Sequence, residues 1–122
     1  MVKKLFIAFL MVTITPTVFA YKVGDKYRLT EADKKGAIAA LKEKLKDPYS
    51  AQWGDVKVAP RLSEVDLGSN GEKQARICVR SNSKNSYGAY TGMSYSLLLK
   101  NLDTGKFTVL FADSTGDLMC SN

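Results

Sequence analysis

The sequence contains no histidine. Without an imidazole, the chain cannot build Ser-His-Asp or Cys-His catalysis, and it lacks the commonest metal-binding side chain. Its only cysteines, Cys78 and Cys120, are 42 positions apart, which fits neither a CxxC redox pair nor the close ligand spacing of a zinc site. No GxGxxG or P-loop motif for a nucleotide phosphate is present. We therefore expect no catalytic residues, no metal site and no cofactor.

Acidic residues are also few and scattered, 12 against 18 lysines and arginines. The only acidic cluster, Glu64, Asp66 and Glu72, flanks a turn-forming run at residues 68–71. Two carboxylates can cleave a glycosidic bond, so a small cell-wall or glycan hydrolase is an alternative function. A solvated acidic surface is the simpler interpretation, and we expect that the protein is not an enzyme.

An apolar run opens the chain, over residues 5–14, and it is short. Lys3 and Lys4 precede the run, and Val18 and Ala20 suit the site at which a signal peptidase cuts. A membrane-spanning helix needs about 20 apolar residues. The pattern predicts a signal peptide over residues 1–20, a single small domain over residues 21–122, and a periplasmic or secreted protein without stable membrane insertion after cleavage.

The charge of the chain is basic but dispersed. Removing Lys3 and Lys4 lowers the formal net charge from +6 to +4. The remaining basic residues are spread along the chain, and no run of them lies on one segment. A soluble surface explains this charge, and weak attraction to anionic partners is the alternative. Nucleic acid is not the expected partner of an exported protein, and the sequence does not indicate an oligomeric state.

Both cysteines belong to the predicted mature chain. In an oxidising compartment, an even number of cysteines favours a disulfide, here between Cys78 and Cys120. The bridge would close a loop of about 40 residues and stabilise the fold by about 4 kcal/mol on the chain-entropy model. Two unpaired thiols are the alternative. A bridge would also fix the tail at residues 118–122 to the central strand.

Hydrophobic periodicity predicts an α+β fold, in which one N-terminal helix packs on an antiparallel sheet of about four strands. Thr30 and Asp33 form an approximate capping box, and the helical spacing continues until Asp47-Pro48 ends the helix. Residues 21–29 form an extended lead-in. Alternating residues predict strands at 55–59, 73–81, 93–100 and 107–111, with a shorter strand at 63–67.

Two aromatic residues follow the helix directly, Tyr49 and the only tryptophan, Trp53. We expect them to close the core where the helix meets the sheet. An aromatic platform for a sugar or a peptide is the alternative interpretation.

The loop of residues 81–93 stands out because it joins two predicted strands and is rich in Tyr, Asn, Ser and Gly. Binding loops use this composition, in which tyrosine supplies contact area and the small polar residues supply hydrogen bonds. The candidate partner-binding residues are Asn82, Lys84, Asn85, Tyr87 and Tyr90. A self-bonded connection between strands is the alternative. We expect a non-catalytic binding protein with a protein partner in the envelope, or otherwise a structural envelope component.

Two segments, residues 46–53 and 78–93, resemble a family of small exported proteins of bacteria and their phages. The shared pattern is a helix ending in DPxSA, followed by C-x-x-x-N-x-KNSYGxYxG leading into a strand. The chain departs from it at Arg80, Ser81 and Ala89, where the family is expected to carry Glu, Val and Gly. The resemblance implies export and an α+β domain, and it assigns no activity or site.

Overall fold

The computed structural model describes residues 20–84, 87–112 and 114–121. In chain order, its elements are α1 (Glu31–Lys42), a 3-10 turn η1 (Pro48–Ser50), β1 (Gln52–Val58), β2 (Asp66–Leu67), β3 (Lys73–Asn82), β4 (Ser94–Asn101), β5 (Phe107–Phe111) and α2 (Ser114–Cys120). The strands form one antiparallel sheet in the order β1-β3-β4-β5, with the two-residue β2 also paired to β3. The predicted α+β fold is confirmed. No helix in the described part of the chain is long and apolar enough to cross a membrane.

Helix α1 begins as predicted, with the complete capping box of Thr30 and Asp33. It ends at Lys42, about one turn before the predicted stop at Asp47-Pro48, through short-range backbone hydrogen bonds that tighten the chain after Leu41. Asp47 instead accepts a hydrogen bond from the Ser50 N–H and opens the separate turn η1. The Asp47-Pro48 motif therefore begins the short turn η1 and does not end α1.

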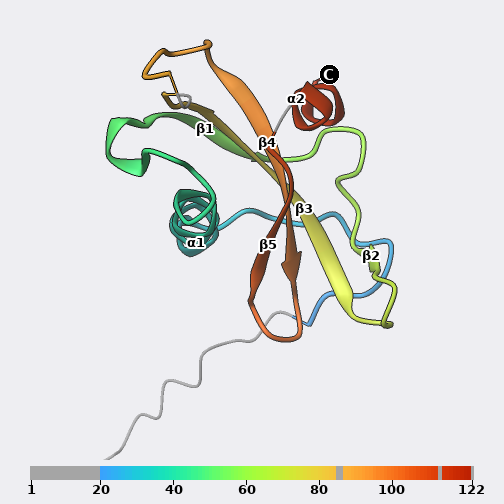
Figure 1. The fold of residues 1–122 in the computed structure, drawn as a ribbon. Helices are drawn as coiled ribbons and strands as arrows, with labels where there is room; N and C mark the ends of the chain where they lie inside the picture. Colours follow the sequence, from blue (N-terminus) through green and yellow to red (C-terminus); the bar gives the residue numbers. More distant parts are fainter. Residues whose placement is uncertain (1–19, 85–86, 113, 122) are drawn as a thin grey trace, which may run out of the picture.

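Both faces of the sheet are covered, by different helices (Figure 1). On the first face, α1 packs on a core that includes Leu41, Ile77 and Leu98, with Trp53 partly buried beside it. On the second face, a smaller cluster joins Cys78 to α2. Strand β3 is buried on both sides because its alternating residues point to both clusters.

The C-terminal segment differs from its prediction. Residues 118–122 were expected to be a tail pinned by Cys120, but residues 118–120 belong to helix α2. The predicted disulfide between Cys78 and Cys120 is confirmed, with the Cα atoms 5.9 Å apart. Both cysteines are fully buried. A seven-residue helix is too short to be stable alone, so its packing and the disulfide hold it in place.

Gly116 allows α2 to lie directly on the sheet. A Cβ at this position would come within 2.7 Å of the Phe111 carbonyl oxygen and 2.8 Å of the Tyr95 carbonyl oxygen. One turn of the helix is also bonded to the sheet, since the Tyr95 N–H donates to the Asp117 carboxylate at 3.1 Å. The backbone of α2 at Gly116 therefore approaches the sheet more closely than a residue with a Cβ atom would permit.

Two features at the margins of the sheet complete the fold. Residues 21–29 are an extended lead-in, held to the rest of the domain by the bridge between Lys26 and Glu64, by backbone hydrogen bonds to residues 63 and 65, and by the bond from Lys100 to the Tyr27 hydroxyl. In β5, a bulge between Leu97 and Leu98 shifts the pairing with β4 and leaves Phe111, the last residue of the strand, 39% exposed.

Replacing Gly116 by alanine tests how α2 is docked. The added methyl group meets backbone atoms that cannot move aside, so we expect Gly116→Ala to destabilise the protein by about 1–3 kcal/mol in urea unfolding. Leu118→Ala is the matched control, since this side chain lies on the same helix and is 73% exposed. An unchanged unfolding midpoint in Gly116→Ala would show that the close contact is not maintained in solution.

Candidate binding surface

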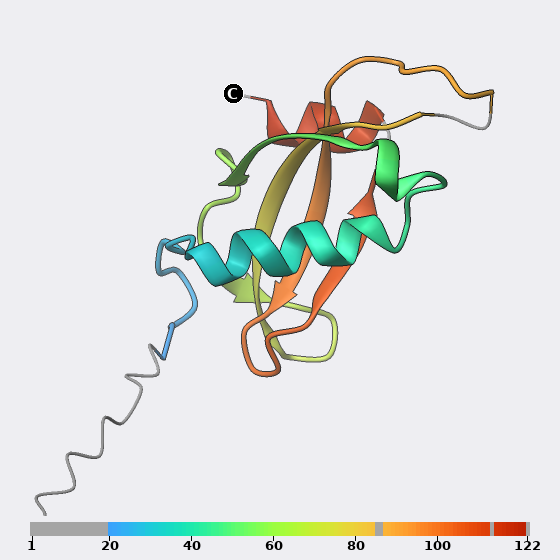
Figure 2. The ribbon, with the colours of Figure 1, turned by 90° about the vertical axis from the view of Figure 1, so that its left-hand side faces the viewer.

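The described part of the connection between β3 and β4, residues 83–84 and 87–93, projects beyond the sheet, and we call it the arm (Figure 2). A bridge between Lys84 and Tyr90 continues the antiparallel pairing of the two strands into it. Asn82, at the end of β3, fixes the base of the arm. Its amide donates to the Gln52 side chain at 3.1 Å, and its oxygen accepts from the Gly92 N–H at 3.2 Å.

Tyr90 joins the arm to the turn that follows α1. Its hydroxyl donates to the Ser50 carbonyl oxygen at 2.7 Å, a bond between residues 40 positions apart. The Lys84 ammonium lies 5.6 Å from the centre of the Tyr90 ring, within the range of a cation–π contact. The arm and η1 are therefore linked at one end of the molecule.

Two tyrosine side chains at this end are almost entirely in solvent. Tyr87 is 94% exposed near the tip of the arm, and Tyr49 in η1 is 98% exposed. The expectation that Tyr49 closes the core is therefore wrong, whereas Trp53 does pack against the core. The difference arises because Pro48 and the Asp47 cap turn the chain at η1 and direct Tyr49 outward.

The five sequence-predicted partner residues thus divide by position. Asn82, Lys84 and Tyr90 come together and build the arm, and Tyr87 is presented by it. Asn85 lies outside the described residues. Sequence composition singled out this segment, but it could not separate residues that shape the arm from a residue that the arm exposes.

Sequence reasoning missed a polar cluster at the base of the arm, on the face of the sheet that carries α2. The Tyr95 ring has the Lys57 ammonium at 4.6 Å and the Arg80 guanidinium at 6.0 Å from its centre. Its hydroxyl donates to Asp55 at 2.8 Å. Burial and this hydrogen bond raise the pKa of Tyr95. Alternation in β1, β3 and β4 put these residues on one face, but their register was not evident from sequence.

The acidic residues that suggested a hydrolase have structural contacts. Asp66 accepts from Arg76 at 2.6 Å across the sheet, and Glu72 accepts from the Asn70 N–H at 3.0 Å within the turn. The bridge to Lys26 places Glu64 beside the N-terminal lead-in. These contacts agree with the interpretation of the cluster as a solvated acidic surface.

A second polar group is buried at the far end of the sheet and joins three segments. Asp33, which is 2% exposed, accepts hydrogen bonds from the Tyr27 hydroxyl at 2.6 Å and from the Lys100 ammonium. Lys100 also donates to the Tyr27 oxygen at 3.0 Å. The lead-in, α1 and β4 are thereby held together by one carboxylate, one ammonium and one phenol.

Mutual contacts set the protonation of this triad. Burial raises the pKa of Tyr27 to about 12, with a further contribution from Asp33. Burial alone would raise the pKa of Asp33, but hydrogen bonds from Lys100, Tyr27 and Thr30 outweigh it and lower that pKa. Burial opposes the charge of Lys100, and the bonds to Asp33 and Tyr27 nevertheless raise its pKa. The triad is thus an ion pair bridged by a neutral phenol.

Removing the cation should be costly. Lys100→Met leaves the Asp33 carboxylate buried without its ion-pair partner, and we expect a loss of about 3–5 kcal/mol in the free energy of unfolding. Lys34→Met is the matched control, because it breaks the exposed Lys34–Glu31 ion pair on α1, the helix that also carries Asp33. That loss should stay below about 1 kcal/mol. Equal effects of the two variants would contradict the structural role of the triad.

The triad also predicts how stability depends on pH. The lowered pKa of Asp33 contributes stability above the ordinary carboxyl pKa, and this is lost as pH falls through the folded-state value. The raised pKa values of Tyr27 and Lys100 contribute stability that is lost as pH rises from about 10 towards 12. Unfolding midpoints measured across pH should therefore fall at both extremes, and Asp33→Asn should flatten both limbs.

No protein-family model matches the chain, and no match was found among curated proteins or solved structures. The resemblance noted in the sequence analysis therefore rests on its motifs alone. Function has to be inferred from the geometry of the arm, the turn beside it and the charged groups around them.

Proposed function

We propose that the protein is an exported, non-catalytic binding protein that engages a protein partner in the envelope through the loop of residues 81–93. It would act as an inhibitor, an immunity factor or an envelope accessory factor. The observation that carries this proposal is the 94% exposure of Tyr87 on an arm whose base is held by the hydrogen bond that Asn82 accepts from Gly92 and the one that Tyr90 donates to Ser50.

An arm of this kind suits recognition for a physical reason. Tyrosine brings a large, rigid contact area with only two rotatable side-chain bonds. The hydrogen bonds at Asn82 and Tyr90 fix the base of the arm before a partner arrives, which reduces the entropy lost on binding. Tyrosines are enriched among the few residues that dominate binding energy at interfaces. We therefore assign Tyr87 as the main contact.

Tyr49 is a second contact in the same proposal. It is 98% exposed on η1, and Tyr90 ties η1 to the arm. Lysines at this end, including Lys44 and Lys84, favour a partner whose surface carries carboxylates. Association should then slow as the salt concentration rises, because added ions screen the attraction between the two surfaces.

Affinity capture followed by a binding measurement tests the proposal. The full chain is expressed for export and used, oxidised, as bait on an envelope extract, beside Tyr87→Ala and the control Val23→Ala. Val23 is exposed, and the N-terminal lead-in to which it belongs lies on the other side of the molecule from the arm (Figure 2). We expect a protein retained by the wild type and by Val23→Ala, with a dissociation constant about tenfold or more higher for Tyr87→Ala.

A further variant separates contact from support. Tyr90→Phe keeps the ring but removes the hydroxyl that donates to Ser50. It should weaken binding less than Tyr87→Ala, by loosening the arm. Equal affinity of Tyr87→Ala and the wild type for every captured protein would rule out the arm as the binding site.

A further inference from the structure

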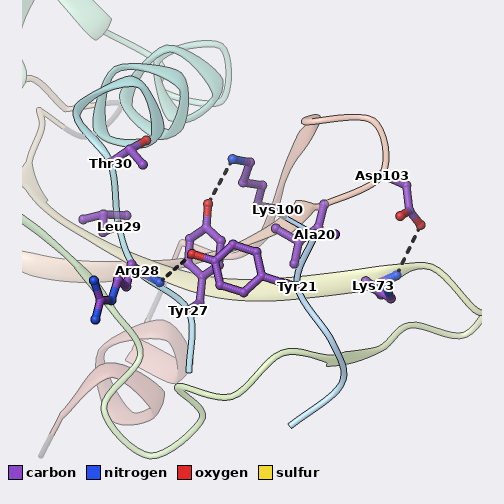
Figure 3. A pocket seen from close by; sticks show the side chains of 10 residues that line it. Ala20, Tyr21, Tyr27, Arg28, Leu29, Thr30, Lys73, Lys100 and Asp103 are labelled. Carbon is purple, nitrogen blue, oxygen red and sulfur yellow. Dashed lines mark hydrogen bonds between the residues drawn. The ribbon is translucent and has the colours of Figure 1, made fainter. Parts of the chain in front are cut away.

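A pocket of about 800 Å³ lies at the end of the sheet opposite the arm (Figure 3). Its walls come from the N-terminal lead-in, the start of β3, the end of β4 and the turn before β5. This volume is within the range of sites that enclose a small organic molecule. The pocket adjoins the buried triad, since Tyr27 and Lys100 both line it.

One wall of the pocket is aromatic and apolar. The rings of Tyr21 and Tyr27 are 4.9 Å apart and tilted by 45°. The Tyr21 hydroxyl accepts from the Arg28 N–H at 3.3 Å, which fixes the ring against the lead-in. Leu29 and Leu102 add aliphatic surface. This wall suits the hydrocarbon part of a ligand.

The polar groups of the pocket are mainly donors. Lys100 carries three N–H groups, of which Asp33 and Tyr27 occupy two, and the third has no partner among the described residues. The absent partner is a hydrogen-bond partner, since the Lys100 ammonium also lies 5.7 Å from the centre of the Phe107 ring. The Lys73 ammonium has no ion pair or hydrogen bond within residues 20–84, 87–112 and 114–121. An ammonium beside an apolar wall attracts a negatively charged oxygen.

The charges in the wall leave a small positive excess. Asp33 balances Lys100, and Asp103 lies beside Lys73, where its carboxylate accepts from the Lys73 backbone N–H at 3.4 Å. Arg28 adds one more positive residue to the lining. The cleavage expected after Ala20 would remove Ala20 from the lining and add the α-ammonium of Tyr21 to the same wall. A monoanion matches this small positive excess, and a second negative charge on the ligand would exceed it.

We propose that this pocket binds a small organic carboxylate, a monoanion with an apolar body. Lys73 supplies the charge that attracts the carboxylate, and the third N–H of Lys100 supplies a directional donor. The apolar body packs between the tyrosine pair and Leu102. This site is independent of the arm, so the two proposals can fail separately.

Titration with simple carboxylates, followed by amide NMR, tests the site. The full chain is expressed for export with ¹⁵N labelling, and the N-terminus of the purified protein is read by mass spectrometry. Benzoate and octanoate probe a flat and a linear body, and benzamide is the neutral match for benzoate. We expect saturable shifts at the amides of Leu29, Lys73, Leu102 and Asp103 for at least one carboxylate, with benzamide about tenfold weaker.

Three variants at this end of the sheet give three different expectations for carboxylate binding. Lys73→Gln removes the attracting charge and should weaken carboxylate binding about tenfold. Asp103→Asn removes the opposing charge, keeps an acceptor for the Lys73 N–H and should strengthen binding. Lys106→Gln, on the same turn but outside the pocket lining, should bind as the wild type does. All three should keep the wild-type unfolding midpoint.

Several results would overturn the proposal. One is the absence of saturable shifts with both benzoate and octanoate at concentrations up to about 10 mM. Another is a set of shifts confined to the arm, or equal binding of benzoate and benzamide. A third is unchanged affinity in both Lys73→Gln and Asp103→Asn, which would remove the electrostatic basis of the site.

Discussion

Burial of β3 on both faces is the constraint on which the rest of the structure depends. The adjacent β3 residues Ile77 and Cys78 point to opposite sides of the sheet, and neither is exposed to solvent. Each face therefore needs its own cover. Helix α1 covers the first face with the apolar side of an amphipathic helix. Helix α2 covers the second face, where a disulfide and a close backbone contact at Gly116 hold it. The two ends of the sheet are left for the arm and the pocket.

Features with a local cause could be predicted from the sequence. The capping box at Thr30 and Asp33 lies within four residues, and alternation over residues 73–81 predicted β3. The pairing of Cys78 with Cys120 followed from the cysteine count and the expected compartment, without any knowledge of the distance between them. In these cases, the residues that decide the structure are close in sequence, or few enough to leave one pairing.

Features that depend on distant residues could not be predicted. The seven residues of α2 show no helical period long enough to detect, and their helix depends on contacts with β4 and Cys78. Lys100 and Tyr27 are 73 positions apart, so nothing local marks the triad. At the candidate binding surface, composition singled out the loop of residues 81–93. It could not show that Tyr90 bonds to Ser50, 40 positions away, and so links the loop to η1, the turn that carries Tyr49.

The position of α2 after every strand also bears on the order in which the protein can fold. A chain made from its N-terminus presents α1 and all the strands before the residues that cover Cys78. Until Cys120 has emerged, the second face of β3 has neither its helix nor its disulfide partner. A nascent sheet would thus hold an unpaired thiol and an uncovered apolar surface at its centre until α2 has been made.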